Sequence, residues 1–381
     1  MAASQNVEIV EVLTKAQRRK FVDYPNQLYK DNPYFVPAFY GDDLDDWDPK
    51  KNPAFEYCEA RCFLAYRDGQ IVGRIGAILS HRANEKWGTK RMRFSQVDFI
   101  DDPAVSKALF DKVEEWAREK GCDELQGPLG FSDMDREGML VDGFDRRSMF
   151  ITYYNDPYYI EHMERMGFEK DADWIEYMLM VPQPGDPNYV KINRIAEAVL
   201  KRSNTHLVKL KKRSEYKPYI RKVFELANVA YAPLYGTVEF NDRQVERYAN
   251  KFIPLINPDY CLLLEDENNE LVAFGIAAPS MAEAMKACHG HLFPFGWIGV
   301  LKSLRKNDAL DLLLVVVRPD LQRLGLNGIL MNRMMQSALK NGIKCAETGP
   351  MLEKNAKILA QFKMFAQEPK KRRRCFVKKI V

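Results

Sequence analysis

The sequence predicts an α+β protein, with an α/β mixed sheet in each of two domains and helices flanking each twisted sheet. Three observations carry this prediction. A chain of 381 residues with 46% apolar side chains is long enough for two ordinary cores. Strand-like and helix-like periodicities alternate along it. The same order of elements recurs on both sides of a Pro- and Gly-rich break, which gives domains at 1–182 and 183–381.

The first half begins with a short strand and a helix that Thr14 caps. Asp68-Gly69 is a two-residue turn between two strands. Asp102-Pro103 opens a long helix with apolar residues at helical spacing, and Gly121 ends it. The stretch 32–48 is rich in rings, prolines and acids, so we expect it to be irregular. The predicted strands are 7–13, 62–66, 70–79, 93–100, 124–127 and 174–181, and the predicted helices are 14–29, 102–120 and 158–166.

The second half repeats this order of elements. Asn268-Asn269 marks a hairpin turn. The stretch 309–317 is nearly all apolar, which is typical of a strand in the middle of a sheet. An inserted segment covers 281–307. The predicted strands are 207–211, 260–265, 270–278, 309–317, 343–348 and 373–380, and the predicted helices are 189–202, 215–228, 242–256, 325–340 and 354–365.

Composition and charge argue against several classes of protein. Lys and Arg number 57 and Asp and Glu number 53, so the net charge of +4 does not indicate nucleic-acid binding. The five His are scattered and the seven Cys form no C-x-x-C pair, so we expect no metal and free thiols in a reducing compartment. No apolar run approaches the roughly 20 residues that span a bilayer, and no signal-peptide pattern is visible. The sequence therefore predicts a cytoplasmic protein.

The strongest local signal follows the strand 309–317. Pro319 ends this strand, and a loop containing Gly325 then leads into a helix. The N-terminus of a helix presents backbone N–H groups that suit a pyrophosphate, and Arg323 adds positive charge. An ordinary strand–loop–helix connection would produce the same pattern.

The segment Gln322-Arg-Leu-Gly-Leu-Asn327 resembles the Q/R-x-x-G-x-G/A loop with which GNAT N-acyltransferases bind acyl-CoA. Asn327 replaces the last small residue of that motif, and Gly328 follows it. The stretches 352–355 and 362–365 are similar to the family's penultimate helix, whose Asn faces the cofactor. The resemblance implies two GNAT-like domains and a co-substrate that is acetyl-CoA or a long-chain acyl-CoA. The implied cofactor-binding residues are Val316, Val317, Gln322, Arg323, Leu324, Gly325, Leu326, Asn327, Gly328 and Asn355.

The first half looks like a second GNAT unit that lacks this loop. Asp101 and Asp102 stand where a pyrophosphate would need N–H groups, and their charge argues against a cofactor there, whereas helix capping explains them. As a whole the chain is similar to a bacterial tandem-GNAT family, with members linked to N-acylation of sphingoid amines in ceramide synthesis. This resemblance implies a lipid or sphingoid long-chain amine as the acceptor. The matching stretches are 31–37, 48–55, 127–130, 138–145, 294–296 and 371–379.

Transfer of an acyl group to an amine needs a base, because an alkylammonium with a pKa near 10 is only about 0.1% neutral at pH 7. Glu347 and Glu353 are the candidate catalytic bases, and each is equally well explained as a solvated carboxylate or a helix cap. The family often supplies a Tyr in the penultimate helix as the acid for the leaving thiolate. This chain has Phe362 there, so the thiolate leaves unprotonated or takes its proton from elsewhere.

Candidate acceptor-binding residues lie mainly in the first half. Tyr153 and Tyr154 belong to a ring-rich loop, for which packing against a sheet is an even alternative. Glu137 and Asp142 belong to a Gly-punctuated segment with little signal for helix or strand. Trp297 lies in the inserted segment.

The inserted segment has a long apolar run at 289–301 that cationic side chains border. This pattern fits interfacial membrane binding or the mouth of an acyl-chain tunnel. A helix that covers a sheet face or a domain interface fits it equally. The basic run 370–374 favours an edge strand or contact with anionic lipid over nucleic acid.

The leading hypothesis is an acyl-CoA-dependent N-acyltransferase of the EC 2.3.1 class whose acceptor is a lipid or sphingoid amine. An acetyltransferase acting on a small polar amine stays open. A catalytically inactive acyl-CoA-binding or lipid-binding protein also stays open, because of Phe362. The pyrophosphate loop argues against an aminoacyl transferase that uses charged tRNA.

Overall fold

The computed structural model describes residues 7–362, 365 and 367–380, which form two compact units. Unit 1 comprises the ranges Met1–Trp174, Ala282–Gly299 and Lys371–Val381, and unit 2 comprises Ile175–Met281 and Val300–Lys370. Each unit is thus assembled from separated stretches of the chain, whereas the sequence suggests the contiguous ranges 1–182 and 183–381. Part of the inserted segment and the last strand belong to unit 1 with most of the first half.

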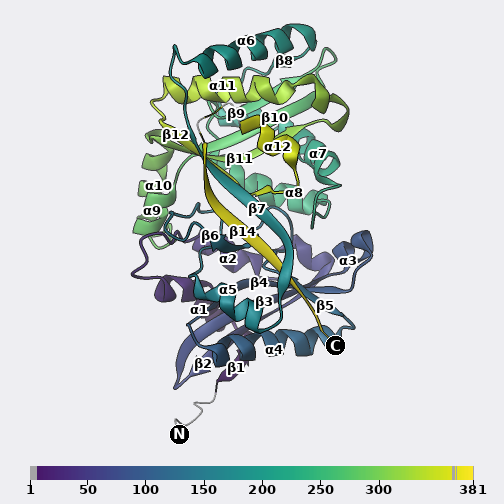
Figure 1. Cartoon of the computed structure of the whole chain (residues 1–381), viewed down its shortest axis with the longest axis vertical. Helices are drawn as coiled ribbons and strands as arrows, with labels where there is room; N and C mark the ends of the chain where they lie inside the picture. Colours follow the sequence, from purple (N-terminus) through teal and green to yellow (C-terminus); the bar gives the residue numbers. More distant parts are fainter. Residues whose placement is uncertain (1–6, 363–364, 366, 381) are drawn as a thin grey trace. The chain divides into compact units, whose positions relative to one another are not determined.

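Unit 1 contains a mixed sheet in the order β1-β2-β3-β4-β5-β14, with β7 beside β14 and β6 also paired to β14 (Figure 1). Strands β4 and β5 run parallel, and β1 to β4 pair antiparallel with one another, as β14 does with β5. The two-residue turn at Asp68-Gly69 is confirmed. The strands are β1 (Glu8–Glu11), β2 (Cys58–Arg67), β3 (Gln70–Ser80), β4 (Arg91–Phe99), β5 (Glu124–Gly127), β6 (Met139–Asp142), β7 (Glu169–Met180) and β14 (Gln367–Lys379).

Unit 2 contains a mixed sheet in the order β7-β12-β11-β10-β9-β8, in which β11 and β12 are the parallel pair. The portion of β7 from Ile175 onward belongs to this unit and pairs antiparallel with β12. In unit 2, β7 therefore pairs with β12 in the way that β14 pairs with β5 in unit 1. The remaining strands are β8 (His206–Leu207), β9 (Cys261–Glu265), β10 (Leu271–Pro279), β11 (Ala309–Val317), β12 (Cys345–Thr348) and β13 (Met351–Leu352).

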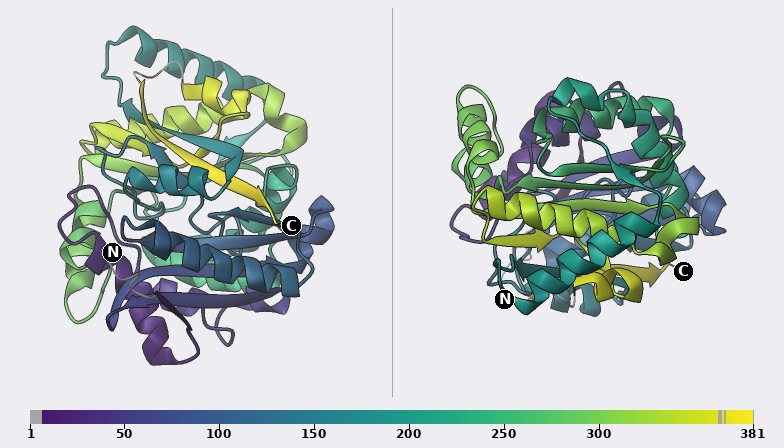
Figure 2. Two further views of the ribbon diagram at one scale, coloured as in Figure 1. Left: turned by 60° about the horizontal axis from the view of Figure 1, so that its bottom comes forward. Right: turned by 90° about the horizontal axis from the view of Figure 1, so that it is seen from above.

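Helices cover both faces of each sheet. In unit 1, α4 packs on β2 to β4, and α1 also contacts these three strands. In unit 2, α11 lies along α6, as Figure 2 shows, and α7 packs on β10 and β11. The helices are α1 (Lys15–Leu28), α2 (Tyr40–Asp46), α3 (His81–Trp87), α4 (Pro103–Glu119), α5 (Tyr158–Arg165), α6 (Pro187–Arg202), α7 (Tyr219–Tyr231), α8 (Asp242–Phe252), α9 (Ala282–Ala287), α10 (Gly296–Arg305), α11 (Leu326–Lys340) and α12 (Ala356–Gln361).

The two sheets share an irregularity at the same place. In unit 1 the register between β3 and β4 shifts at Gln96, whose φ of 42° is left-handed. In unit 2 the register between β10 and β11 shifts at Leu313, because Ile276 pairs with Leu314 and Ala277 pairs with Leu312. Such a bulge re-aims the strand just beyond it. The two units therefore share a strand order and a bulge, so the repeat of elements seen in the sequence is also a repeat in the structure.

Two glycines of β3, Gly73 and Gly76, allow close packing on the two faces of this strand. A Cβ added at Gly76 would lie 2.2 Å from the ring of Trp47. A Cβ added at Gly73 would lie 2.8 Å from Leu109 of α4. These two glycines let a ring on one face and a helix on the other approach the strand closely.

Several local expectations differ from the structure. The acidic stretch 32–48, expected to be irregular, contains α2, because Asp42 and Asp43 sit in its first turn where the helix dipole favours negative charge. The segment 134–145 contains β6, which forms only because β14 pairs with it from a distant part of the sequence. The expected strand at 207–211 shrinks to β8. Residues 363 and 364 of the helix expected at 354–365 lie outside the described residues.

Candidate active site

The parallel strands β11 and β12 of unit 2 separate before β11 reaches its end. Their last paired residues are Leu312 and Thr348, after which Gly349 donates its N–H to the Leu312 carbonyl at 2.8 Å. β11 continues to Val317, and in this stretch the described residues give it ladder partners only on β10. One edge of β11 therefore presents backbone N–H and C=O groups to an incoming group.

The corresponding edge of unit 1 is closed by the chain itself. The paired residues of β4 and β5 end at Arg93 and Gln126. Beyond them, Leu129 donates its N–H to the Phe94 carbonyl at 3.0 Å, and the Arg93 guanidinium donates to the Gly130 carbonyl at 3.0 Å. The two units thus share a topology and differ in whether the strand edge is occupied by protein.

The loop after β11 folds as a 3-10 helix at Pro319–Leu324 and passes through Gly325, whose φ is +81°, into α11. A residue with a Cβ would be strained in this left-handed conformation. The side chains of Gln322, Arg323 and Leu324 are exposed. The first N–H groups of a helix lack partners within the helix, and here that of Gly328 already donates to the Gly325 carbonyl at 2.9 Å.

The start of the equivalent helix in unit 1 is arranged differently. Asp102 accepts a hydrogen bond from the Ala104 N–H at 2.8 Å and pairs with Arg67 at 2.7 Å. The bond from Arg67 holds the pKa of Asp102 below its usual value. Asp102 therefore acts as the helix cap that the sequence suggested, and it puts a carboxylate where unit 2 has Gly325.

Glu347 lies at the point where β11 and β12 separate. Its side chain is only 4% exposed and comes one residue before Thr348. Asp311, 2% exposed, is its register partner on β11, so the two carboxyl groups extend from the same face of the sheet. Sequence reasoning missed Asp311, although a lone acid inside an apolar strand was the available signal. Glu353 is half-buried between β13 and α12.

Other residues expected around the cofactor have local structural partners. The Asn355 side chain caps α12 by accepting from the Ile358 N–H at 3.2 Å. Val316 is buried in the core of unit 2, so only its backbone is available to a ligand. Leu326 is fully buried. Phe362, at the position of the family's Tyr, is buried in the same unit. Val317 and Asn327 are half-buried.

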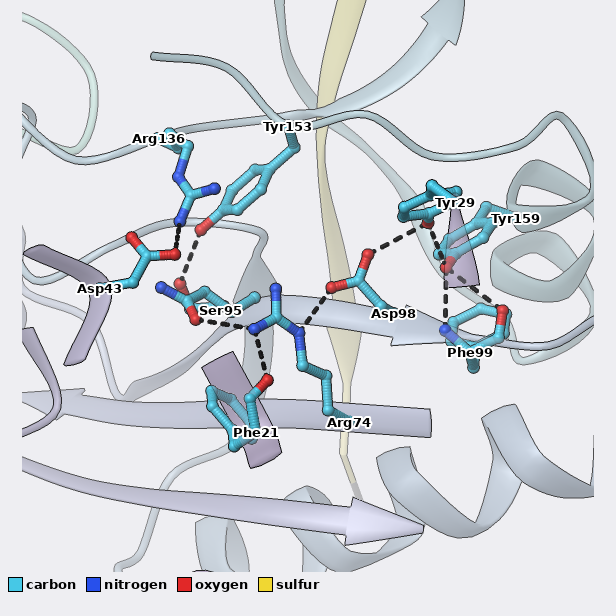
Figure 3. A network of polar contacts seen from close by, with 11 residues as sticks. Phe21, Tyr29, Asp43, Arg74, Ser95, Asp98, Phe99, Arg136, Tyr153 and Tyr159 are labelled. Carbon is cyan, nitrogen blue, oxygen red and sulfur yellow. Dashed lines mark hydrogen bonds and ion pairs between the residues drawn. The ribbon is translucent and has the colours of Figure 1, made fainter. Parts of the chain in front are cut away.

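Tyr153 and Tyr154 line a small, partly open cavity in unit 1. Its wall also carries two ion pairs, Asp43 with Arg136 at 2.5 Å and Asp98 with Arg74 at 2.7 Å (Figure 3). The Arg136 guanidinium lies 4.7 Å from the centre of the Tyr153 ring. Burial raises the pKa of Tyr153, so its hydroxyl is protonated at neutral pH.

A chain of hydrogen bonds extends the same network. Tyr29 donates to Asp98 at 3.1 Å, and its hydroxyl lies 2.8 Å from that of Tyr159. Tyr159 in turn accepts from the Phe99 N–H at 2.9 Å (Figure 3). Arg74 is 1% exposed and also donates to the Phe21 carbonyl at 2.8 Å. The sequence pattern gave no sign of these charged residues, because they are far apart in the chain.

The remaining acceptor candidates are not in this cavity. Glu137 lies in a second acidic group with Asp133 and Asp135, close to Arg93. Burial raises the pKa of Glu137, and it raises the pKa of Asp133 to about 6. Asp142 is exposed at the end of β6, and Trp297 is 43% exposed on α10.

Comparisons with known proteins agree with this geometry. No protein-family profile matches the chain. It matches the tandem GNAT protein from the clavulanic acid biosynthesis pathway with a TM-score of 0.57, at 14% identity and covering 98% of each chain. The chain therefore has the tandem GNAT fold, and the fold expectation is confirmed.

Two curated relatives are similar over most of the sequence. Protein YghO of Escherichia coli is 26% identical over 378 residues, covering 97% of this chain and 94% of the relative. The bacterial ceramide synthase of Caulobacter vibrioides is 27% identical over 307 residues, covering 80% of this chain and 78% of the relative. The sequence is thus similar to a relative of the ceramide-synthase type that its motifs resemble.

Neither a metal cluster nor a membrane-spanning helix occurs in the described part of the chain. No group of three or more His, Cys, Asp or Glu residues is placed to hold a metal ion there. No helix there is both long and apolar enough to cross a bilayer. All seven cysteines are free thiols, and burial raises the pKa of Cys58 to about 11, so this thiol is not a thiolate at neutral pH.

The raised pKa of Asp133 predicts a pH-dependent stability difference. The folded carboxyl keeps its proton up to about pH 6, whereas an unfolded one loses it near its ordinary pKa of 3.8. Its contribution to stability is therefore greatest at low pH and declines as pH rises through this interval. Asp133→Asn removes that penalty and should raise the free energy of unfolding at pH 7.5 by about 2 kcal/mol, with no gain at pH 4.

Denaturant unfolding at the two pH values measures this difference. Asp145→Asn, which changes an exposed carboxyl of the same segment, is the matched control and should have no such pH dependence. A gain from Asp133→Asn that is equal at both pH values would contradict the titration of this carboxyl.

Proposed function

We propose that the protein is an acyl-CoA-dependent N-acyltransferase, with the acyl-CoA bound by unit 2. The observation that carries this proposal is the open edge of β11, which leads directly into the Gly325 turn and the N-terminus of α11. A strand edge suits an amide-containing chain, and a helix N-terminus suits a pyrophosphate at its end. The CoA thioester joins these two kinds of group in this order.

The residues of the loop fit roles in holding the cofactor. The N–H groups at the start of α11 would bind the pyrophosphate, and Gly325 lets the backbone turn without strain. Gln322, Arg323 and Leu324 are exposed beside this turn, and Arg323 contributes the positive charge. Backbone groups at Val316 and Val317 would bind the pantetheine arm. The Oδ1 atom of Asn355 caps α12, so its Nδ2 group is the part of the amide that would bind the cofactor.

Glu347 is the proposed proton acceptor for the amine. It stands at the separation of β11 and β12, close to where the thioester would lie if its arm follows β11. Removing the ammonium proton lets the nitrogen attack the thioester carbon, and the C–S bond breaks as the amide forms. The nitrogen loses a second proton in this step, which the CoA thiolate takes up directly or through solvent. Asp311 is its register partner on β11, so a second carboxyl group lies on the same face of the sheet. Glu353 is the second candidate for this role.

The proposed acceptor is a lipid or sphingoid long-chain amine. Support comes from the relative named bacterial ceramide synthase. Unit 1, whose strand edge is filled by its own chain, would contribute acceptor binding instead of a second cofactor site. Tyr153 and Tyr154 are the acceptor residues favoured by their place in the cavity, whereas Glu137, Asp142 and Trp297 lie outside its lining.

The inserted segment would hold the protein against a membrane that supplies such an acceptor. Its exposed side chains include Phe293 at 82%, Phe295 at 73% and Ile298 at 50%. The exposed side of α10 adds Lys302 and Arg305 at helical spacing from Ile298. Aromatic side chains flanked by cations are typical of a surface that binds anionic lipid. We therefore propose a cytoplasmic protein that binds the membrane peripherally.

Charge reversal in the loop tests the cofactor site. Arg323→Glu should weaken the binding of octanoyl-CoA about tenfold at low salt, and high salt should reduce this effect, since both partners are exposed. Isothermal titration measures the binding. Arg333→Glu changes an exposed arginine of α11, outside the loop, and should bind octanoyl-CoA as the unchanged protein does. Equal weakening by both variants, or none by Arg323→Glu, would count against this loop.

Removal of the proposed base tests the chemistry. Glu347→Gln should lower kcat for release of free CoA from octanoyl-CoA and sphinganine about 100-fold or more, while the Kd for octanoyl-CoA stays unchanged. Raising the pH should partly restore the rate, because more of the amine is then neutral. Glu353→Gln, made in parallel, decides between the two candidates. Absence of CoA release in the unchanged protein would favour a binding protein without activity.

Removal of the exposed rings tests the membrane contact. The double variant Phe293→Ser with Phe295→Ser should lose most of its co-sedimentation with vesicles of phosphatidylglycerol, because burial of both rings is lost. Vesicles of phosphatidylcholine should retain less of the unchanged protein. The single variant Leu13→Ser alters an exposed apolar residue elsewhere in unit 1 and should sediment normally. Equal co-sedimentation of the double variant and the unchanged protein, together with equal co-sedimentation with the two lipids, would contradict the membrane contact.

A further inference from the structure

The segment of unit 2 that leads from the end of α6 through β8 into α7 (Figure 1) is strongly basic. Residues 201–222 contain nine Lys and Arg and a single acid, Glu215, so their net charge of +8 exceeds the +4 of the whole chain. The proposed function uses none of these bases. Five exposed side chains in the middle of the segment form what we call the basic surface of unit 2: Lys209, Lys211, Lys212, Arg213 and Lys217.

The start of the basic surface is fixed to the sheet of unit 2. Val208 donates its N–H to the Leu263 carbonyl at 2.9 Å, and Val208 and Leu210 both pack on the core of this unit. Lys209 and Lys211 alternate with these two apolar residues and are exposed. Alternate side chains of an extended segment point to opposite sides, so the apolar residues hold the segment while the lysines point to the solvent.

The far end of the basic surface is anchored around Tyr216. This side chain is buried, and its hydroxyl donates to the Cys261 carbonyl at 2.9 Å. Glu215 accepts hydrogen bonds from the backbone N–H groups of Lys211 and Lys212 at 2.6 and 3.0 Å. These bonds hold the pKa of Glu215 below its usual value. The single carboxylate of the segment is thus used to hold the turn, and the bases around it remain in excess.

The ion pairs of this region lie outside the basic surface. Among the described residues, Arg221 pairs with Asp242 at 3.3 Å and Lys222 pairs with Glu270 at 3.9 Å. Residues two apart in an extended chain are separated by about 7 Å, which is within the Debye length of about 8 Å at physiological salt. The repulsion between the bases is therefore only partly screened, and an anionic partner would relieve it.

The composition of the basic surface favours one kind of anionic partner. The segment 209–217 has one aromatic ring, that of Tyr216, and this ring is buried, so it cannot stack on nucleobases. Protein interfaces depend on Trp, Tyr and Arg anchors seated in pockets, whereas four of these five bases are exposed lysines. A layer of lipid headgroups needs no such anchors, because mobile lipids adjust to flexible basic side chains through charge alone.

We propose that the basic surface of unit 2 binds the anionic headgroups of a membrane, as a site separate from the inserted segment. The inserted segment would bury aromatic rings in the lipid, whereas this site would act by charge alone. Salt should therefore weaken the second contact far more than the first. The inference goes beyond the proposed function, because headgroup binding by unit 2 does not depend on acyl transfer.

Neutralising the lysines tests this assignment. The triple variant Lys209→Gln, Lys211→Gln and Lys212→Gln should lower the partition of the full chain onto vesicles containing about 30% phosphatidylglycerol at least about tenfold, since each base near an anionic surface contributes about fivefold. Co-sedimentation at about 100 mM NaCl measures the partition. A triple variant that sediments as well as the unchanged protein overturns the proposal.

A second triple variant controls for the loss of net charge. Lys191→Gln, Arg194→Gln and Arg333→Gln remove the same charge from exposed positions of α6 and α11 in the same unit. This variant should keep its partition within about twofold of the unchanged protein. An equal loss in both triple variants would mean that net charge acts without a site, and it would overturn the assignment. Circular dichroism checks that both variants fold.

The contribution of the inserted segment is separated by combining variants. Phe293→Ser with Phe295→Ser should leave some sedimentation at low salt, and this remainder should disappear when the three lysines are also replaced. A remainder that survives their replacement would overturn the proposal. The same holds for binding of a DNA strand of about 20 nucleotides that depends on the three lysines when vesicle binding does not, because the surface would then bind nucleic acid.

The outcomes also separate this inference from the proposed function. The Kd for octanoyl-CoA, measured without vesicles, should be equal in the triple lysine variant and the unchanged protein. A higher Kd in the variant would assign these bases to the cofactor and overturn the lipid site. A protein that releases no CoA, but loses vesicle binding with its three lysines, would overturn acyl transfer and retain the lipid site.

Discussion

A strand whose neighbour leaves it must find other partners for its backbone N–H and C=O groups, and the organisation of this protein depends on that constraint. Both sheets contain a parallel pair that separates after a few residues. In unit 1 the chain satisfies the strand edge through Leu129. In unit 2 the described residues give the last part of β11 ladder partners on β10 alone. One duplicated topology thereby provides two different surfaces: the helix that follows is capped by Asp102 in unit 1 and by Gly325 in unit 2.

The features that sequence predicted best are those encoded by neighbouring residues. The Asp68-Gly69 turn, the Thr14 cap and the buried strand ending at Val317 are each specified by a few consecutive side chains. Asp102 likewise revealed its capping role by its position before Pro103.

What sequence could not provide is contact between distant segments. β6 is a strand only because Arg373 and Arg374, more than 200 positions later, pair with it. Asp43 and Arg136 meet across 93 positions, and no periodicity marks either of them. The two tyrosines of the ring-rich loop were noticed for their residue type, whereas the charged groups beside them could be found only in three dimensions. Asp311 was hidden for a related reason, since an apolar strand draws attention to its apolar residues.

The position of β14 has a consequence for biosynthesis. Residues 376–379 pair with residues 124–127, which the ribosome adds to the chain about 250 residues earlier. The β5 edge of the sheet of unit 1 therefore stays unpaired until residues 376–379 have been made. Such long-range pairing folds slowly, and a strand edge left open during that interval is exposed to other chains. The last segment of unit 2 ends at Lys370, and the last segment of unit 1 begins at Lys371. Unit 1 therefore begins first in the sequence, but its sheet is completed after that of unit 2.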